Sequence, residues 1–283
     1  MDDQRQDSEA APAALPPLKF GTRIFYGLGS IAFGIKDNGF QTVLLLFYNQ
    51  VVGLPAASVG TAILLALALD AIVDPIVGHI SDNLRTPWGR RHPFMYLAAI
   101  PLGLSYVLLW NPPPLTPEMQ FVYLLVVAII VRTCIGLYEA PSSALAPELT
   151  RDYQERTALI GYRMFFAWFG GLAMYFLAFT VLLRPDATHP VGQLNPVGYA
   201  HYGLVAGAAM TITILLSAMG THSRIKTFSV PAPRPKGERK TVREIFSTLS
   251  HSSFLAILAS NLFSAAATGL SFSMNLYFYT YFW

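Results

Sequence analysis

Long unbroken runs of apolar residues alternate along the chain with short polar loops. The apolar residues do not follow the spacing of a half-buried helix or strand, and this pattern is typical of helices that lie in lipid. A run of about 20 apolar residues is long enough to cross a bilayer. The sequence therefore predicts an all-α transmembrane protein with seven spans, at about residues 22–49, 58–80, 94–110, 120–146, 158–183, 198–219 and 252–283.

Basic residues are distributed unequally between the two sets of loops. If the N-terminus lies in the cytoplasm, the outer segments hold only Arg184. The inner segments then hold Arg5, Lys19, Arg23, Arg85, Arg90, Arg91, Arg151, Arg156, Arg224, Lys226, Arg234, Lys236, Arg239, Lys240 and Arg243. Lys and Arg concentrate on the cytoplasmic side of membrane proteins. We therefore predict an integral protein of the cell inner (plasma) membrane with a cytoplasmic N-terminus.

The composition narrows the class of protein. Hydrophobic residues make up 53% of the chain and charged residues 12%, and the charged share is about half that of a soluble domain. Cys134 is the single cysteine, which excludes a disulfide framework. The six histidines are scattered and form no metal-ligand pattern. We expect no enzymatic activity, no metal, no cofactor and no nucleic-acid partner, and we expect the lipid bilayer and a small molecule as partners.

Polar segments divide the chain into regions. Residues 1–19 are acidic and rich in Ala and Pro, lack the features of a signal peptide, and are interpreted as a disordered cytoplasmic tail. Residues 20–219 hold the first six spans. Residues 220–250 are basic, contain PAPRPKGE, and have the composition of a cytoplasmic linker. Residues 251–283 hold the seventh span, and because the chain ends inside this apolar segment, we expect a truncated part of a longer protein.

The loop after the second span, GHISDNLRTPWGRR, contains a patterned motif. Its sequence fits G-x-x-x-D-x-x-R-x-x-x-G-R-R at Gly78, Asp82, Arg85, Gly89, Arg90 and Arg91. Glycine at position 78 lets a neighbouring helix approach closely. The Asp82 carboxylate can accept charge-assisted hydrogen bonds from an arginine or from a helix N-terminus. We interpret the motif as a gating element on the cytoplasmic face rather than as a plain basic loop.

Seven ionisable residues lie within or at the edge of the predicted spans: Lys36, Asp37, Asp70, Asp74, Arg132, Glu139 and Arg163. A charge at the bilayer centre costs roughly 2.5–3.5 kcal/mol, so each needs a partner, a water-filled cavity or a function. Asp70 and Asp74 are one helical turn apart and share a face. Two such carboxylates repel each other, so one is protonated or a cation lies between them. We favour a site for H⁺ or Na⁺ over a structural ion pair with Lys36 or Arg132.

The remaining charges are typical of a site for a polyhydroxyl ligand. Lys36 and Asp37 are adjacent, so their side chains diverge by about 100°. From this position Lys36 is able to reach toward the acids of the second span while Asp37 faces another part of a cavity.

Arg132 and Glu139 share nearly one face of the fourth span, and Arg163 is placed to neutralise Glu139 or to bind a polar ligand. Carboxylates and a guanidinium match hydroxyl groups, which both donate and accept hydrogen bonds. Aromatic faces complete such sites, and the candidates are Tyr138, Tyr162 and Trp168. Taken singly, each aromatic is better interpreted as packing or as part of a lipid belt.

Four stretches together resemble one family of membrane transporters. They are YGLGSIAFGIKDNGFQTVLLLFYNQVVGL, DAIVDPIVGHISDNLRTPWGRRHPF, YEAPSSALAPELTRDYQERTAL and GYRMFFAWFGG. They resemble the glycoside–pentoside–hexuronide:cation symporters, the melibiose-permease group of the major facilitator superfamily. The resemblance implies a major facilitator fold, in which residues 20–219 form the N-terminal six-helix bundle. Residues 251–283 would then be the first helix of a truncated C-terminal bundle, since family members have twelve spans.

The resemblance also implies roles for single residues. Asp70 and Asp74 match the paired acids that bind the coupling cation in this family. The substrate-binding positions are matched by Lys36, Asp37, Glu139 and Arg163. The implied function is symport of a sugar, glycoside or oligosaccharide with a cation by alternating access.

Three positions depart from the melibiose-type pattern: Val73 replaces Asn, Gly136 replaces Thr and Ser143 replaces Trp. The first two remove side-chain oxygens, and because Na⁺ needs several oxygen ligands while a proton needs one carboxylate, we favour H⁺ over Na⁺. The alternatives left open are a lysolipid-type transporter of the same branch and an inactive fragment. A seven-helix receptor is disfavoured because its N-terminus would lie outside.

Overall fold

The structure is a computed structural model, and it describes residues 17–225 and 252–282. Its long helices are α4 (Ala56–Asn83), α5 (His92–Leu109), α6 (Pro117–Leu149), α7 (Tyr153–Leu177), α8 (Pro196–His222) and α10 (Ser252–Phe282). These six helices, with α7 prolonged by the π-helical turn η3 (Ala178–Leu182), are long and apolar enough to cross a membrane. No strand occurs in the described residues. The prediction of an all-α transmembrane fold is confirmed.

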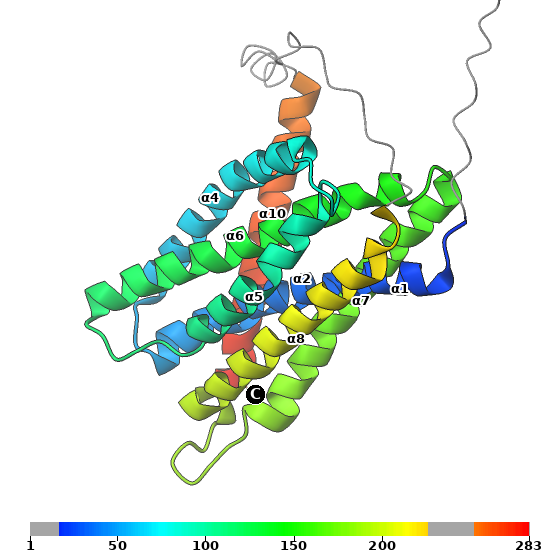
Figure 1. The fold of residues 1–283 in the computed structure, drawn as a ribbon. Helices are drawn as coiled ribbons and strands as arrows, with labels where there is room; N and C mark the ends of the chain where they lie inside the picture. Colours follow the sequence, from blue (N-terminus) through cyan, green and yellow to red (C-terminus); the bar gives the residue numbers. More distant parts are fainter. Residues whose placement is uncertain (1–16, 226–251, 283) are drawn as a thin grey trace, which may run out of the picture.

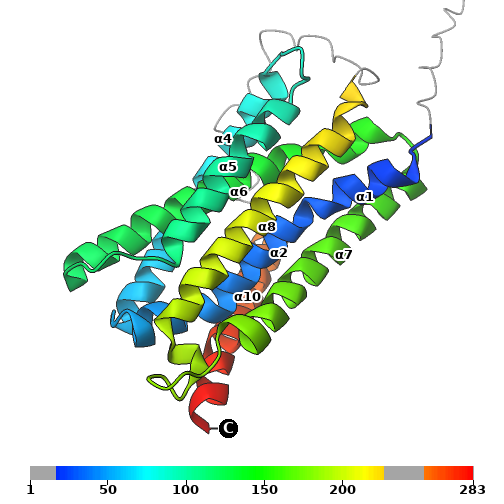
Figure 2. The same cartoon turned by 60° about the horizontal axis from the view of Figure 1, so that its bottom comes forward.

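The first predicted span is built from short pieces rather than from one regular helix. They are α1 (Phe20–Leu28), α2 (Ser30–Asn38), the π-helical turn η1 (Gly39–Val43), α3 (Leu44–Leu46) and the π-helical turn η2 (Phe47–Val51). Figure 2 shows α1 and α2 following one another between α7 and α8. Turns of the π type inside helices occur frequently at functional sites. Here η1 begins two residues after Asp37, at the end of the helix that carries the first two intramembrane charges.

Close helix contacts form where two helices present small residues to each other. A Cβ atom at Gly34 of α2 would collide with the backbone carbonyl oxygen of Ala167 in α7, and Gly171 faces the same contact. Helices α5 and α8 approach each other in the same way at Gly103 and Gly207. In a bilayer, small residues of this kind allow backbones to pack by van der Waals contact. Helix α4 packs along α6, as Figure 1 shows.

For orientation, the end of the bundle that holds residues 84–91 is called the motif end, and the opposite end is called the far end. A cluster of buried aromatic rings fills the core near the far end. The rings of Trp110 and Tyr199 are stacked with centroids 5.9 Å apart, and Phe47 lies 4.4 Å from Tyr199. By contrast, many large apolar side chains on α4 and α7 are exposed. Such an exposed apolar surface is suited to lipid contact.

Helix α10 is attached to the other helices near its C-terminal end. It packs against η1 and α3, and the Tyr277 hydroxyl donates a 3.0 Å hydrogen bond to Oδ1 of Asn49. The Tyr281 hydroxyl donates a 2.5 Å hydrogen bond to Oε1 of Gln50. The hydroxyl of Thr280 donates to Gln193 in the short helix η4 (Gly192–Leu194). Figure 1 shows this end of α10 beside the loop between α7 and α8.

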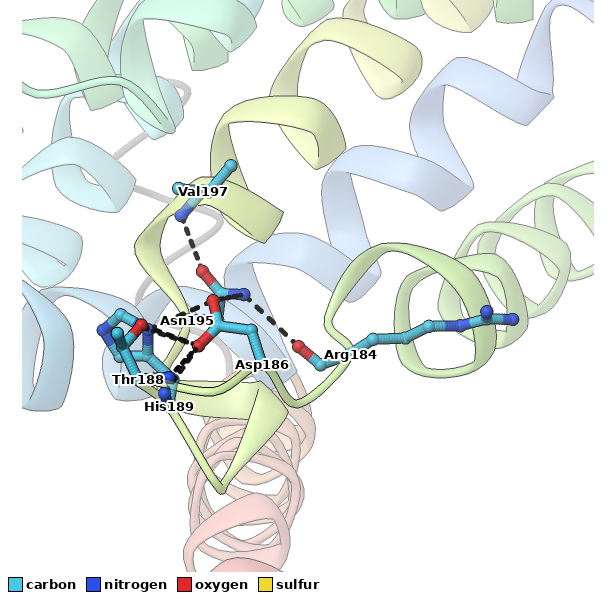
Figure 3. A network of polar contacts seen from close by, with 6 residues as sticks. All are labelled: Arg184, Asp186, Thr188, His189, Asn195 and Val197. Atoms are coloured by element: carbon cyan, nitrogen blue, oxygen red, sulfur yellow. Dashed lines mark hydrogen bonds and ion pairs between the residues drawn. The ribbon is translucent and has the colours of Figure 1, made fainter.

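The loop between η3 and α8 is fixed by a polar network (Figure 3). Oδ1 of Asp186 accepts hydrogen bonds from the backbone N–H and hydroxyl of Thr188, at 2.8 and 2.7 Å, and from the backbone N–H of His189 at 2.6 Å. The Asn195 amide donates to Oδ2 of Asp186 at 3.0 Å, while Asn195 Oδ1 caps the start of α8 at Val197. Hydrogen bonds from the Thr188 hydroxyl and the His189 backbone lower the pKa of Asp186 to about 2.

Two of the predicted regions lie largely outside the described residues. Residues 1–16 and 226–251 are not described, so a disordered tail over residues 1–19 and a linker over residues 220–250 stay predictions. Helix α1 begins at Phe20, two residues before the predicted start of the first span. Helix α8 continues to His222, which is three residues past the predicted end of the sixth span.

Candidate substrate and cation site

The seven intramembrane charges come from four helices that pack together. Helix α2 carries Lys36 and Asp37, α4 carries Asp70 and Asp74, α6 carries Arg132 and Glu139, and α7 carries Arg163. Helix α6 lies against α4, and α7 lies against α2. The Lys36 ammonium also interacts electrostatically with charges on α4 and α6. The seven charges therefore form one group, as expected for polar residues that must be compensated inside a membrane.

The expected neutralisation of Glu139 by Arg163 is confirmed. The guanidinium of Arg163 donates through Nη2 to Oε1 of Glu139. Through Nη1 it donates to the Ser142 hydroxyl at 3.0 Å and to the Tyr26 hydroxyl at 3.4 Å, and it lies 5.6 Å from the centre of the Tyr26 ring. The guanidinium is thus held by residues of α1 and α6. Burial of Arg163 leaves it few alternatives to these partners.

The sequence pattern does not single out Tyr26 or Ser142. Both are common packing residues. For Ser142 the sequence offers one signal, because Ser142 follows Glu139 by three residues and therefore shares its helix face. Tyr26 gives no such signal, because its contact with Arg163 depends on how α1 packs against α7.

Lys36 pairs with its sequence neighbour Asp37 and forms no ion pair with the acids of α4 in the described residues. Its ammonium lies 3.6 Å from Oδ1 of Asp37 and 4.5 Å from the centre of the Phe33 ring, instead of extending to Asp70 and Asp74. The four-carbon stem of lysine bends back easily, so neighbouring positions on a helix do not prevent the pair. Asp37 is the more exposed partner, and its Oδ2 accepts a 2.6 Å hydrogen bond from Gln41.

The two acids of α4 have different surroundings. Nη2 of Arg132 lies 2.6 Å from Oδ2 of Asp70, and both side chains are mostly buried. The structural ion pair with Arg132, which the sequence analysis disfavours for these acids, therefore forms, but only at Asp70. Asp74 forms no ion pair within the described part of the chain, and its Oδ1 lies over Gly136 of α6, where a Cβ would collide with it.

Among the seven intramembrane charges, one carboxylate has no partner cation. Three cations pair with three acids, as Lys36–Asp37, Arg132–Asp70 and Arg163–Glu139. The fourth acid, Asp74, leaves the group with a formal charge of −1 when every acid is ionised. A single unpaired carboxylate in a membrane helix is expected to bind a proton or another monovalent cation.

The three aromatic candidates differ in their relation to the charges, and Tyr138 interacts electrostatically with Arg163 and Glu139. Tyr138 is fully buried and donates to the Ser217 hydroxyl at 3.2 Å. Trp168 is 71% exposed on the apolar face of α7, and Tyr162 packs against Gly27. Their arrangement agrees with packing and lipid contact, which was the better interpretation of each residue singly.

The loop motif is tied to the end of α6. Arg90 and Arg91 both pair with Glu148, the second of these at 3.3 Å, and Arg91 also lies 3.3 Å from Oδ1 of Asp82. The expected bond between Asp82 and an arginine is thus confirmed. Gly89 has a φ of +79°, and its carbonyl accepts a 2.6 Å hydrogen bond from Thr86. A residue without Cβ is favoured at such a turn.

Two positions of the motif behave differently from expectation. A Cβ at Gly78 would meet nothing within 4 Å among the described residues, so none of the described helices makes the close approach predicted there. Arg85 is exposed and forms no ion pair within the described ranges. Glu148, which the sequence reasoning missed, is the acid that joins the motif to α6. In the sequence Glu148 lies 58 residues from Arg90, so residue spacing gives no signal for this contact.

A cavity of about 400 Å³ lies apart from these charges, near the far end. Its walls include Phe47, Trp110, Gln120 and a run of prolines at residues 112–114, and none of the seven intramembrane charges lines it. The cavity is therefore not the polar site that a hydroxyl-rich ligand requires.

An all-helical bundle with a group of paired charges at membrane depth defines an integral membrane protein of the transporter class. The chain matches the family model described as MFS/sugar transport protein over residues 25–283, and it belongs to that family. The resemblance to the glycoside–pentoside–hexuronide:cation symporters of the major facilitator superfamily is thereby confirmed. Membership of a transporter family also bears out the expectation that the chain is not an enzyme.

Similar curated proteins agree with this family. The inner membrane symporter YicJ of Escherichia coli (strain K12) is 28% identical over 229 residues, which is 81% of this chain and 48% of that protein. The isoprimeverose transporter of Lactiplantibacillus pentosus is 30% identical over 232 residues, 79% of this chain and 48% of the relative. The sodium-dependent lysophosphatidylcholine symporter 1-A of Danio rerio is 29% identical over 158 residues, 54% and 29% of the two chains. The chain thus spans at most about half the length of these relatives.

Proposed function

We propose that this chain supplies the substrate and cation site of a symporter that moves a sugar or glycoside together with one proton. The observation that carries the proposal is the charge pattern of the site, in which three ion pairs and one unpaired acid come from four adjacent helices. The names of two relatives support parts of this function, because YicJ is named a symporter and the Lactiplantibacillus pentosus relative is named an isoprimeverose transporter.

The substrate side of the site is formed by the pairs Arg163–Glu139 and Lys36–Asp37. Oε2 of Glu139 is buried without a hydrogen-bond partner in the described part of the chain, so it can accept a hydroxyl donor. The Asp37 side chain is 41% exposed and faces outward from its ion pair. Together the two carboxylates and the guanidinium offer both acceptors and donors to a neutral polyhydroxyl ligand.

The cation side of the site is Asp74, with Asp70 beside it. Protonation of Asp74 removes the one uncompensated charge of the site. The neutral site then loses less solvation free energy when it is closed off from water during alternating access. Val73 and Gly136 add no side-chain oxygen near Asp74, which favours a proton over Na⁺.

The placement in the cell belongs to the same proposal. Basic residues concentrate at the motif end, so we place this end and the N-terminus in the cytoplasm. In this orientation the network of Arg90, Arg91, Asp82 and Glu148 lies on the cytoplasmic face and acts as the gating motif. A bacterial inner membrane, as in the name of YicJ, is the expected location.

Uptake in membrane vesicles tests the function. The complete protein is expressed, and accumulation of a radiolabelled glycoside is measured under an imposed pH gradient or Na⁺ gradient. We expect a pH gradient to drive accumulation, and Asp74→Asn and Glu139→Gln to abolish it. Glu118→Gln is the matched control, because Glu118 lies in the exposed first turn of the same helix as Glu139. Accumulation that responds to neither gradient, or that survives in Asp74→Asn, would reject the proposal.

The lysolipid alternative is favoured by one observation, the name of the Danio rerio relative. The same vesicles offered labelled lysophosphatidylcholine distinguish the two substrates. Cation-driven uptake of the lipid, with no competition by glycosides, would replace the sugar in the proposal.

A further inference from the structure

Arg132 has the geometry of a fixed cation built into the acidic pair of α4. Its Nη2 lies 2.6 Å from Oδ2 of Asp70, and the two side chains are only 12% and 15% exposed. The guanidinium is also 5.8 Å from the centre of the Phe40 ring in η1, so it is held from a third segment. A planar guanidinium in such a setting stays charged at all accessible pH values.

The pair is held by one hydrogen bond, which leaves it incomplete. Oδ1 of Asp70 and Nε of Arg132 are buried and have no hydrogen-bond partner within the described ranges. A full two-bond fork would have satisfied both atoms. The guanidinium therefore occupies one side of the Asp70 carboxylate without saturating it.

The other charged groups near Asp74 do not neutralise Asp70 or Asp74. The groups that act on Asp74 electrostatically are Asp70 on its own helix, Arg132 and Glu139 on α6, and Lys36 on α2. Lys36 and Glu139 have partners of their own, Asp37 and Arg163. Helix α10 carries no Asp, Glu, Lys or Arg. Arg132 thus decides whether the neighbouring acids carry one negative charge or two.

The position of the guanidinium disfavours a metal cation. Na⁺ requires several oxygen ligands, and the densest supply of oxygens here is the four carboxylate oxygens of Asp70 and Asp74. The Arg132 guanidinium takes one of these oxygens and places a like charge next to the position that Na⁺ would need. A proton needs only one lone pair of Asp74, so it is not excluded.

We propose that Arg132 is the specificity-determining residue that restricts the cation site to a proton, by occupying Asp70 as a tethered cation and leaving Asp74 as the acid that titrates. This inference rests on the proposed symport function. In each cycle one proton bonds to a carboxylate oxygen of Asp74 on one side of the membrane and leaves the same oxygen on the other side. Asp70 and Arg132 neither gain nor lose a proton during the cycle.

The test compares cation selectivity among variants of the complete protein that keep or remove the charges of the Asp70–Arg132 pair. In Arg132→Gln the two acids are both uncompensated, so we expect Na⁺ to stimulate glycoside uptake at least fivefold, while wild type changes less than 1.5-fold. Arg132→Lys keeps a cation and is expected to stay Na⁺-insensitive. The double variant Asp70→Asn/Arg132→Gln restores a single acid, so it is expected to lose the Na⁺ response and to keep proton coupling. Substrate-induced alkalinisation of a weakly buffered vesicle suspension measures that coupling.

A binding measurement keeps the proposal testable if transport is lost. Na⁺ is expected to raise the melting temperature of purified Arg132→Gln above its value in choline chloride at equal ionic strength, and to leave wild type unchanged. Arg132→Asn serves the same test if the glutamine variant does not fold.

The outcomes separate this inference from the proposed function. Wild type without gradient-driven uptake rejects the symport proposal itself. Proton-coupled wild type with a Na⁺-insensitive Arg132→Gln, or an equal Na⁺ response in the single and double variants, overturns the role of Arg132 alone. Na⁺-driven uptake by wild type also overturns it, while sugar symport stands.

Discussion

Glu148 is expected to contribute more to stability than any single surface acid, because it neutralises two arginines. Its side chain is 15% exposed, and those of Arg90 and Arg91 are 22% and 9% exposed. Burial lowers the pKa of Arg91, while the acids Glu148 and Asp82 oppose that shift. The Glu148→Gln substitution keeps the shape of the side chain and removes its charge, so both guanidinium groups lose their shared partner.

The magnitude follows from how buried this network is. Breaking a fully buried ion pair costs about 3–5 kcal/mol, whereas an exposed pair contributes about 0–1 kcal/mol. The partial exposure of Glu148 and the remaining contact of Arg91 with Asp82 at 3.3 Å place the cost between these limits. We expect a loss of about 2 kcal/mol in the free energy of unfolding. For a chain of this size, that loss corresponds to a melting temperature lower by about 4–8 °C.

Thermal unfolding in detergent measures this effect. Cys134 is buried, so its reaction with a thiol-reactive fluorophore reports unfolding. The matched control is Glu155→Gln, because Glu155 pairs with Arg23 at 2.8 Å and both side chains are more exposed, at 24% and 30%. We expect a fall of at most about 2–4 °C in this control. Equal melting temperatures for the two variants would refute the reasoning that burial sets the strength of the Glu148 network.

Two further predictions concern a loop and a helix contact. The pKa of Asp186 is lowered to about 2, so its hydrogen bonds stabilise the loop of residues 183–195 at neutral pH, and the stabilisation is lost as the pH falls from about 4 toward 2. Hydrogen-exchange protection of the His189 amide, corrected for the intrinsic rate, is expected to fall over this range in wild type and to be low at every pH in Asp186→Ala. Gly34→Ala is expected to lower the melting temperature, because the new Cβ collides with the Ala167 carbonyl and overpacking costs about 1–3 kcal/mol. Gly161→Ala, where a Cβ meets nothing within 4 Å, is the control and is expected to show no loss.

The membrane spans could be predicted from the sequence because lipid imposes a length and a composition on every crossing helix. The irregular turns η1 and η2 could not, because their position depends on contacts with other helices, which the periodicity of the sequence does not show. At the start of η1, for example, Gly39 lies against the hydroxyl of Tyr106 from α5.

The charged site shows the same division between composition and geometry. The pairing of Glu139 with Arg163 could be predicted, because opposite charges on adjacent membrane spans have few other partners. The direction of Lys36 could not, because a flexible stem decides between Asp37 and the acids of α4. The close contact expected at Gly78 depended on which helix lies beside α4 at that level, and sequence spacing does not contain this information.

The Asp70–Arg132 pair allows a last prediction that separates a functional from a structural role. In Asp70→Asn the guanidinium loses its carboxylate, and Asp74, one turn away on the same face, becomes its nearest acid. The two then neutralise each other, no acid is left to exchange a proton, and substrate-induced proton movement is expected to fall at least tenfold without any response to Na⁺. Removing the other partner, in Arg132→Gln, is expected to produce the opposite change, a gain of Na⁺ response. A pair that only holds α4 against α6 would lose the same interaction in both variants. Equal effects on stability and an unchanged cation preference in Asp70→Asn and Arg132→Gln would therefore assign the pair to structure alone.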